Sequence, residues 1–583
     1  MVSSDQLLLL LQNRAFQQAL EVAEQLLCAF PDHAALKACV AACALQLAAE
    51  AQQQGSLQLA ESYCRRLLSL EADHAEGLFR LAYLLQEQHH ADAETCYRRL
   101  IERHPDHSEA WYNLANLLQQ AQRLPEARAG YQQVVRLQPN HAKAWNNLGL
   151  LLQRLDLLDE ARFALQEAVR LAPEQGDYWA NLGNLLLKNG HNQEAATCYR
   201  HALKREPHHP VILCNYGILL QEQRRLPEAE QCYRQLLERL PDHGEARWHL
   251  ALLLLQQGRY QEGWQHYEAR FLPGQRQHPP PSWPFPQWQA GESVAGLSLL
   301  LLCEQGFGDT IQFCRFVSRL RQEGVRRVTM LCPTPLYPLL QGLPGIDLLL
   351  ADPEEERVPP HDRWLSLMSL PHRLALATEA ALQVELPYLA AAPERLPLWQ
   401  AELPAAGIKL GLLWQGSAQH RNDRHRSIPS LTLLAPLWQM REIRWVSLQM
   451  GGGEAECAAL AAQQPLLALG SRINDFADTA AIISQLQGVV TVDSAVAHLC
   501  AALGKPCWLL LPRHSTDWRW LLARSDSPWY PGVMRLFRQQ QVGKWDAVIL
   551  ELVGALRQAL ATGILFNERA DSTHPDPDEP ECR

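Results

Sequence analysis

The sequence predicts an α-helical solenoid followed by an α/β region of two doubly wound domains that face a cleft. Three observations predict this class: a 34-residue repeat in the first half, a proline- and tryptophan-rich interruption, and short apolar runs that alternate with helical stretches in the second half. We therefore divide the chain into a repeat array (residues 1–271), a linker (272–295), two α/β domains (296–390 and 391–565) and an acidic tail (566–583).

The array is predicted from positions that recur in register. Three sets share the 34-residue period: the tryptophans Trp111, Trp145 and Trp179, the alanines Ala127, Ala161, Ala195 and Ala229, and the prolines Pro105, Pro139, Pro173, Pro207 and Pro241. Aromatic, small and proline positions at a fixed period indicate stacked helix pairs. The pattern weakens to fragments before about residue 72, so the first two units rest on fewer matching positions.

Four asparagines occupy one further phase of the array: Asn113, Asn147, Asn181 and Asn215. Each lies on the first helix of its pair, so we expect these side chains, the asparagine column, to line one surface of the solenoid. An amide offers both a donor and an acceptor, which matches a peptide backbone, and solenoids present extended binding faces. The column predicts either a polypeptide-binding surface or a position that serves repeat packing and solvation.

Composition limits the function classes. The net charge is −10 and no basic block occurs, which argues against nucleic acid as the main partner. The sequence shows neither an uninterrupted apolar run of about 18 residues nor the pattern of a secretory signal, so we expect no membrane span. The 15 cysteines form no C-x-x-C pair, and we expect reduced thiols in a cytoplasmic protein.

The second half predicts two parallel sheets. Eight apolar runs are expected to be strands: residues 299–303, 328–332, 346–350, 365–370, 408–413, 445–449, 488–492 and 507–511. Apolar strands that alternate with helices indicate parallel sheets covered on both faces. Ligands of such folds bind at the carboxyl ends of the strands.

Gly306, Gly308 and Asp309 lie between the first predicted strand and a helix. Glycines allow close backbone approach, and a helix N-terminus attracts anions. The carboxylate of Asp309 is placed to accept a proton from an attacking hydroxyl, with helix capping as the alternative.

Two further segments follow strands of the second predicted sheet. Ser417, Arg424 and Arg426 lie in a polar, basic loop, whose hydroxyl and guanidinium donors suit a pyrophosphate unless the loop is merely solvated. Asp493 and Ser494 precede a helix that contains His498. Asp493 and Ser494 would contact sugar hydroxyls or phosphate, or only cap the helix. His498 would donate to a phosphate or pack in the core.

A tryptophan-rich segment at residues 517–531 follows the last predicted strand. Its rings are expected to cover a ligand or to pack in the core. Asp475 is expected to cap a helix that begins beside it.

These motifs resemble known families. The array resembles tetratricopeptide repeats, and the asparagine column is similar to that of protein O-GlcNAc transferases, which implies a role in holding acceptor polypeptide. The second half resembles glycosyltransferase family 9, the heptosyltransferases, whose catalytic region begins with a strand–G-x-G-D–helix turn and ends with D-[TS]-x-x-x-H-x-x-A-A-L-G-x-P. The matching positions are Gly306, Gly308 and Asp309, and then Asp493, Ser494, His498, Ala501, Ala502, Leu503, Gly504 and Pro506.

The family resemblance implies a GT-B fold that needs no metal, with Asp309 as general base and a nucleotide-sugar site in the second α/β domain. The phosphate-binding Ser/Thr and Lys of that family are replaced here by Ser417 with Arg424 or Arg426. We therefore expect transfer of a sugar from an ADP-heptose-like or UDP-sugar donor to a polypeptide recruited by the repeats, without a cofactor.

Two alternatives remain open at this point. The chain would be a non-catalytic scaffold with a nucleotide-binding transferase-like domain, or a transferase that acts on a glycan or lipid-linked acceptor. The sequence leaves the sugar, the acceptor and any homo-oligomeric state undetermined.

Overall fold

The computed structural model describes residues 4–272, 283–352, 357–420, 422–460 and 466–563. The chain forms two compact units, Met1–Leu219 and Leu220–Arg583, which are described separately. The acidic tail and most of the proline-rich part of the linker lie outside the described residues.

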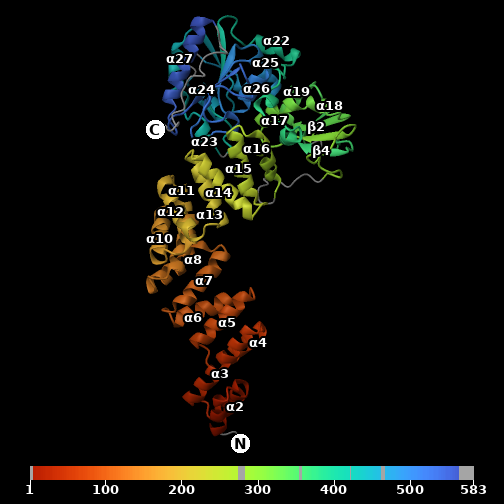
Figure 1. Cartoon of the computed structure of the whole chain (residues 1–583). Coiled ribbons are helices and arrows are strands. Elements are labelled where there is room, and N and C mark those ends of the chain that lie inside the picture. Colours follow the sequence, from red (N-terminus) through yellow and green to blue (C-terminus); the bar gives the residue numbers. More distant parts are fainter. Residues whose placement is uncertain (1–3, 273–282, 353–356, 421, 461–465, 564–583) are drawn as a thin grey trace, which may run out of the picture. The chain divides into compact units, whose positions relative to one another are not determined.

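The first unit is a series of helices that pack as successive pairs (Figure 1). They are α1 Ser4–Gln12, α2 Phe16–Ala29, α3 Ala34–Gln53, α4 Leu57–Leu70, α5 Ala75–Glu87, α6 Asp92–Arg103, α7 Ser108–Gln120, α8 Leu124–Leu137, α9 Ala142–Arg154, α10 Leu158–Leu171, α11 Gly176–Lys188, α12 Asn192–Arg205 and α13 Pro210–Glu222, which crosses into the second unit. The predicted helical solenoid is confirmed, and its helices continue through the stretch before residue 72. The pattern weakens there because α3 has 20 residues where α7 has 13.

Helix α3 qualifies the expectation of no membrane span. By length and composition it is the one helix of the described residues that is apolar enough to cross a bilayer. Its side chains Val40, Cys43 and Ala44 are fully buried in a cluster that includes residues of α2 and α4. That packing is also typical of a core helix in a soluble protein.

The recurring histidines, tryptophans and prolines close the turns between units. The Nδ1 atoms of His107 and His141 accept the backbone N–H of Ala110 and Ala144, at 3.2 and 3.1 Å, so each histidine is a helix N-cap. The indoles Trp111, Trp145 and Trp179 donate to the carbonyls of Pro105, Pro139 and Pro173, each at 2.9 Å. These bonds give the period its physical cause, and they make the turn histidines part of the repeat structure.

Small residues in the array permit close helix approach. A Cβ added at Gly149 would lie 2.6 Å from Cγ of Leu165, and one at Gly183 would lie 2.9 Å from Cε1 of Tyr199. Helices α9 and α10, and α11 and α12, therefore pack with no room for a side chain at these glycines.

The second unit begins with the last repeat helices and continues into two sheets. The repeat elements are α14 Leu226–Arg239, α15 Gly244–Gln256, α16 Tyr260–Tyr267 and the 3-10 helix η1 Glu268–Phe271. Trp264 and Tyr267 of α16 belong to the same buried cluster as the strands of both sheets. The last repeat thus shares one hydrophobic core with the α/β region.

Both sheets are parallel throughout. The first has the strand order β3-β2-β1-β4 and the second the order β10-β9-β8-β5-β6-β7. The strands are β1 Ser298–Leu302, β2 Arg327–Pro333, β3 Leu348–Asp352, β4 Arg363–Ser366, β5 Ile408–Leu413, β6 Ile443–Ser447, β7 Leu466–Ala468, β8 Gly488–Val492, β9 Cys507–Leu511 and β10 Met534–Arg538. The predicted parallel sheets are confirmed, whereas β7 and β10 were not predicted. The strand expected at residues 365–370 ends at Ser366, because the chain turns helical at Leu367.

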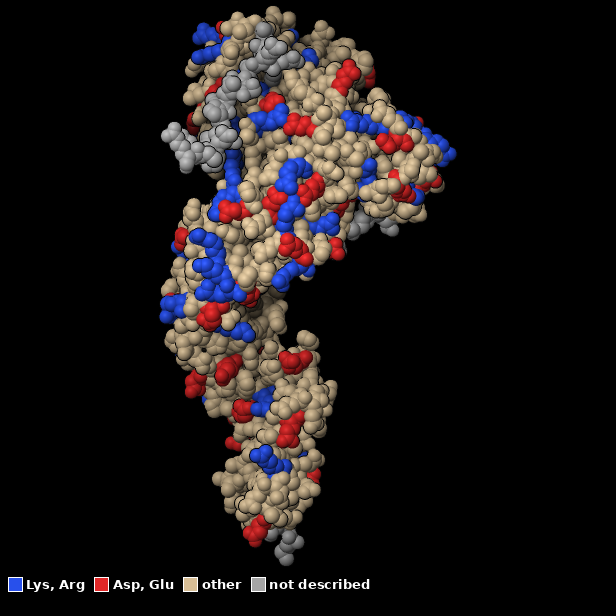
Figure 2. Space-filling model, in the orientation of Figure 1, with Lys and Arg blue, Asp and Glu red and all other residues tan. Residues whose placement is uncertain are grey.

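Helices flank the strands of both sheets. They are α17 Phe307–Phe313, α18 Arg319–Gln322, α19 Tyr337–Leu340, α20 Leu370–Arg373, α21 Glu379–Leu382, α22 Leu396–Gln400, α23 Asp423–Arg426, α24 Gly452–Leu460, α25 Phe476–Ser484, α26 Ala495–Ala502 and α27 Asp546–Thr562. Asp475 caps α25 as predicted, since its side chain accepts the N–H of Asp478 at 2.9 Å. Figure 2 shows acidic and basic side chains interspersed over the visible face.

The strand order identifies one switch point in each sheet. The chain leaves β1 toward one edge and returns on its other side as β4, and it does the same from β5 to β8. Ligands of doubly wound sheets bind outside the carboxyl ends of strands at such points. The two switch points therefore mark where a site belongs in this fold.

Candidate functional site

The two predicted motif turns follow the strands at these switch points and meet each other. Gly306, Gly308 and Asp309 come after β1, whereas Asp493, Ser494 and His498 come after β8. A Cβ added at Gly308 would lie 2.9 Å from Cδ2 of His498 and 3.4 Å from Cα of Ala495. The start of α17 thus packs directly on α26, and the absence of a side chain at Gly308 is required for that contact.

Asp309 lies on the first turn of α17, with both carboxylate oxygens engaged. Its Oδ2 accepts the backbone N–H of Gly306 at 2.8 Å, and its Oδ1 accepts from the guanidinium of Arg519. The capping alternative therefore holds in part: Asp309 caps the helix as the third residue of a capping box, while Gly306 is the N-cap residue. Burial raises the pKa of the Asp309 carboxyl, while the charge of Arg519 and the N–H of Gly306 oppose that rise.

Arg519 joins the two motif regions and was missed from the sequence. It lies in the 3-10 helix η9 (Trp518–Trp520), after β9, and its side chain is only 6% exposed. Its Nη1 donates to both oxygens of Asp517, at 3.0 Å each, and its guanidinium lies 4.4 Å from the centre of the Trp518 ring. The only signal in the sequence was its position between two tryptophans, which indicates burial. A buried cation requires an anionic partner, but the sequence does not indicate which one.

Asp493 and Ser494 lie at the carboxyl end of β8, and both are partly buried. Burial, aided by the Asp517 carboxylate, raises the pKa of Asp493 to about 6, whereas the charges of Arg426 and Arg519 oppose the rise. Ser494 occupies the N-cap position of α26 without a side-chain capping bond, and its Oγ lies 3.0 Å from Oγ1 of Thr491.

His498 is enclosed by protein. Its Nδ1 lies 2.9 Å from the hydroxyl of Tyr530, and its ring stacks on Trp520 with 5.2 Å between ring centres. Burial lowers the pKa of His498 well below its ordinary value, so the imidazole is neutral at pH 7. The structure therefore places this ring in the core beside Gly308.

The loop after β5 presents only part of the predicted set to the site. Arg426 is 14% exposed, and its Nε lies 3.4 Å from Oδ1 of Asp423. Asp423 also accepts from the hydroxyl of Ser427 at 2.7 Å, which fixes the loop. Ser417 and Arg424 are exposed, and Nε of Arg424 lies 3.0 Å from Nε2 of the neighbouring His425.

The last repeat holds the turn that precedes Asp309 (α16 and α17 in Figure 1). Arg270 of η1 is buried and donates to both carboxylate oxygens of Glu304, at 2.8 and 3.1 Å. The side chain of Gln305 donates to the hydroxyl of Tyr267 at 3.2 Å, and Gln305 itself has φ +63°. Turns of the array show the same left-handed conformation, for example at Gln122 and Asp156, so it marks a tight turn here.

In the first unit, the asparagine column forms bonds from one repeat to the preceding one. Asn147 Nδ2 donates to the hydroxyl of Tyr112 at 3.0 Å and to Oδ1 of Asn116 at 3.3 Å. The same kind of bond, at 2.8 Å in each case, joins Asn181 to Asn146 and Asn215 to Asn184. The column therefore contributes to repeat packing through its amide N–H groups.

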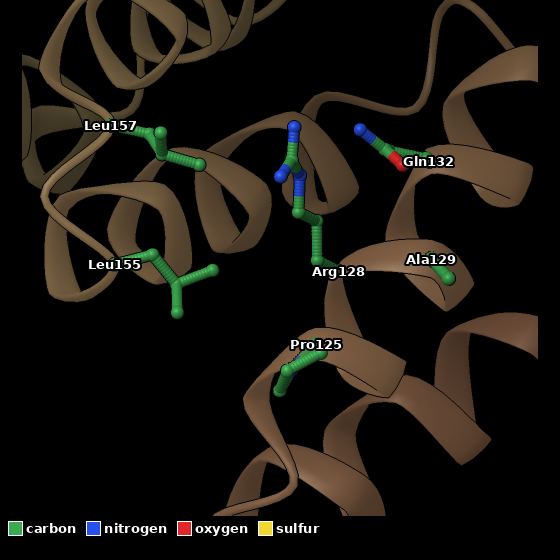
Figure 3. A pocket seen from close by; sticks show the side chains of 6 residues that line it. All are labelled: Pro125, Arg128, Ala129, Gln132, Leu155 and Leu157. Carbon is green, nitrogen blue, oxygen red and sulfur yellow. The ribbon is translucent and has the colours of Figure 1, made fainter.

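A separate hollow of about 400 Å³ lies on the second helices of the array (Figure 3). It lies between α8 and the α9–α10 turn, and its lining residues are Pro125, Arg128, Ala129, Gln132, Leu155 and Leu157. The asparagine column instead lies on the first helices, so the hollow is unrelated to it.

One group in the described residues has metal-ligand spacing: Asp177, Glu206 and His209. Nδ1 of His209 is placed to accept the N–H of Ile212, at 3.5 Å, which leaves the ring proton on Nε2. Nε2 lies 3.2 Å from the Asp177 carboxylate. This geometry is a hydrogen bond to a carboxylate and matches the capping role of the other turn histidines.

Comparison with known proteins supports the repeat assignment. Residues 15–276 match the family model described as the cilia and flagella-associated protein 70 C-terminal domain. Protein FlbA of Caulobacter vibrioides is 27% identical over 327 residues, which are 51% of this chain and 52% of FlbA, so the chain spans about half the length of this curated relative.

Solved structures match the chain only in part. MamA is 19% identical with a TM-score of 0.27, over 28% of this chain and 95% of that one. PilF of Pseudomonas aeruginosa is 20% identical with a TM-score of 0.32, over 35% and 93%. With the 34-residue period, the helix pairs and the family match together, the chain is a tetratricopeptide-repeat protein with a C-terminal region of parallel sheets.

Proposed function

We propose that the α/β region is a glycosyltransferase of GT-B type, which transfers a sugar from a nucleotide-sugar donor to a polypeptide recruited by the repeats. The observation that carries this proposal is the meeting of the two motif turns at the switch points of both sheets, with Gly308 against His498. Turns so distant in sequence have no local reason to meet, whereas a transferase requires its base beside its donor site.

The geometry supports the following proposed roles. The carboxylate of Asp309 removes the proton from the acceptor hydroxyl, whose oxygen then bonds to the anomeric carbon while the bond to the nucleoside diphosphate breaks. A pKa raised by burial brings Asp309 nearer the operating pH, which favours a general base. Arg426, Asp493 and Ser494 lie on the donor side, where a guanidinium suits the diphosphate and the oxygens suit sugar hydroxyls.

Two experiments test the proposal. Thermal unfolding of the full chain with ADP-, UDP-, GDP- and dTDP-sugars is expected to show a raised melting temperature for one donor class. Asp309→Asn keeps an acceptor for the N–H of Gly306 and is expected to lower transfer by 100-fold or more, within the range for general acid–base catalysis of roughly 10²–10⁴-fold.

The matched control is Asp475→Asn, which replaces another helix-capping carboxylate by an amide that caps equally well. It is expected to leave transfer unchanged. If no donor raises the melting temperature, the scaffold function is favoured. If a donor binds but only a glycan or lipid-linked acceptor is modified, the polypeptide acceptor is wrong while the transferase stands.

A further inference from the structure

The orientation of Asp309 is determined by two groups from different parts of the α/β region. One carboxylate oxygen is held by the N–H of Gly306 on its own turn, and the other by Arg519 after β9. Arg519, which follows the second-sheet strand β9, thus prevents free rotation of the Asp309 carboxylate.

Arg519 is itself held on every side. Asp517 accepts two bonds from Nη1, Gln312 of α17 accepts from Nε, and the guanidinium lies over the Trp518 ring. Leu521, directly after η9, has φ +55° and ψ −163°, a region used almost solely by glycine. The backbone conformation after η9 is thus strained, which is consistent with a loop that aims its side chain at a fixed target.

We propose that Arg519 is the positioning residue of the site: it aims the carboxylate of Asp309 and keeps it ionised, so the base is complete only when the turn after β1 and the loop after β9 are in contact. The inference rests on the proposed function, since it assigns Arg519 a role in the same reaction. A lysine would not replace it, because one ammonium cannot bridge Asp309, Asp517 and Gln312 as the planar guanidinium does.

The charges around Asp309 give this role a measurable signature. Arg519 favours the ionised carboxyl, whereas the carboxylates of Asp517 and Glu304 raise its pKa together with burial. Tyr267 also lies in this environment but is neutral, because burial raises the pKa of its hydroxyl. Loss of the guanidinium therefore moves protonation of Asp309 to higher pH.

The test compares Arg519→Met with Arg519→Lys in the full chain. For the donor and acceptor found with the wild type, kcat/KM is measured against pH. We expect the acidic limb to move up by about one pH unit or more in Arg519→Met and by less in Arg519→Lys, with a fall in kcat that exceeds the change in donor KM. A folded Arg519→Met variant that keeps the wild-type limb would overturn the proposal.

Two controls separate this role from a structural one. Arg524→Met removes an arginine that follows Arg519 closely in the chain and pairs with Glu379 and Asp526. We expect it to leave the acidic limb of the pH profile in place. In a double-mutant cycle read by thermal unfolding, Arg519→Met is expected to lower the melting temperature by at least twice as much in the wild type as in Asp309→Asn. Equal effects in both backgrounds would contradict the pairing. The double-mutant cycle is measured without any transfer activity, so it tests the pairing independently. Absence of transfer by the wild type would contradict the proposed function instead.

Discussion

At the scale of single residues, the site gathers three partly buried carboxylates around one buried arginine. Asp309, Asp493 and Asp517 surround Arg519, and burial raises the pKa of the first two. Such an arrangement costs folding free energy, because a carboxylate that leaves water loses more hydration than one shared cation returns. Residues kept at that cost are typical of functional sites.

Asp493→Asn tests this cost. The folded-state pKa of Asp493, about 6, lies above the ordinary aspartate value of about 3.9, so its contribution to stability is present below pH 4 and lost as pH rises through 6. The amide removes that loss, and we expect the variant to be more stable than the wild type at pH 7.5 by roughly 1–3 kcal/mol. Thermal unfolding at pH 7.5 and pH 4.5 measures the difference, which should shrink at the lower pH.

The same variant is expected to lose the donor-induced rise in melting temperature. The control for the stability measurement is Asp546→Asn, a change in the first turn of α27. It should not raise the stability of the donor-free protein at pH 7.5. Equal melting temperatures for wild type and Asp493→Asn at pH 7.5 would contradict a buried, costly carboxylate.

Single residues also show where prediction from sequence ends. Asp309 and Asp493 were identified because each follows a buried strand and precedes a helix, which is a local pattern. Arg519 was not, since its partner Asp309 lies 210 residues away and nothing local to either residue indicates the pair. Gly308 was predicted as a close-approach position, but the structure shows that the approaching group is His498 of α26.

At the scale of elements, periodicity predicted the helices whose packing repeats from pair to pair. It did not predict elements that occur only once. The 34-residue pattern gave helices α7 to α14, because each pair buries the same positions against its neighbours. Strands β7 and β10 escaped prediction for separate reasons. The first has only three residues. The second, Met534–Arg538, carries arginines at positions 535 and 538, which interrupt the apolar run that marks the other strands.

The element that links the last repeat to the sheets is η1, and Arg270→Met tests its importance. Arg270 pairs with Glu268 and Glu304, and its loss leaves two largely buried carboxylates with fewer partners. We expect destabilisation of about 3 kcal/mol or more, because breaking a buried pair leaves uncompensated charge. Arg259 is 43% exposed, and its partners Glu230 and Glu262 both keep Arg234 when it is lost, so Arg259→Met should cost less than about 1 kcal/mol. Thermal unfolding measures the stability of both variants. Similar losses of melting temperature would show that the ion pairs of Arg270 contribute no more than surface pairs.

At the scale of the whole molecule, the question is whether the asparagine column binds polypeptide in addition to joining repeats. Replacing Asn113, Asn147, Asn181 and Asn215 by alanine removes both functions. The matched control replaces their asparagine partners Asn116, Asn146 and Asn184, which removes the amide-to-amide bonds between repeats while the column side chains stay. The control also removes acceptors for Tyr131 and Tyr199, so it too weakens packing inside the array.

If the column holds a peptide backbone, only the column variant loses transfer to a long polypeptide acceptor. Each amide-to-backbone bond contributes about 0.5–1.5 kcal/mol, so four of them predict a fall in kcat/KM of tenfold or more. Hydrolysis of the donor should be unaffected in both variants, because it requires the site near Asp309 alone. Equal falls in kcat/KM for the two variants would assign the column to repeat packing, and the acceptor would then have to be recognised elsewhere on the chain.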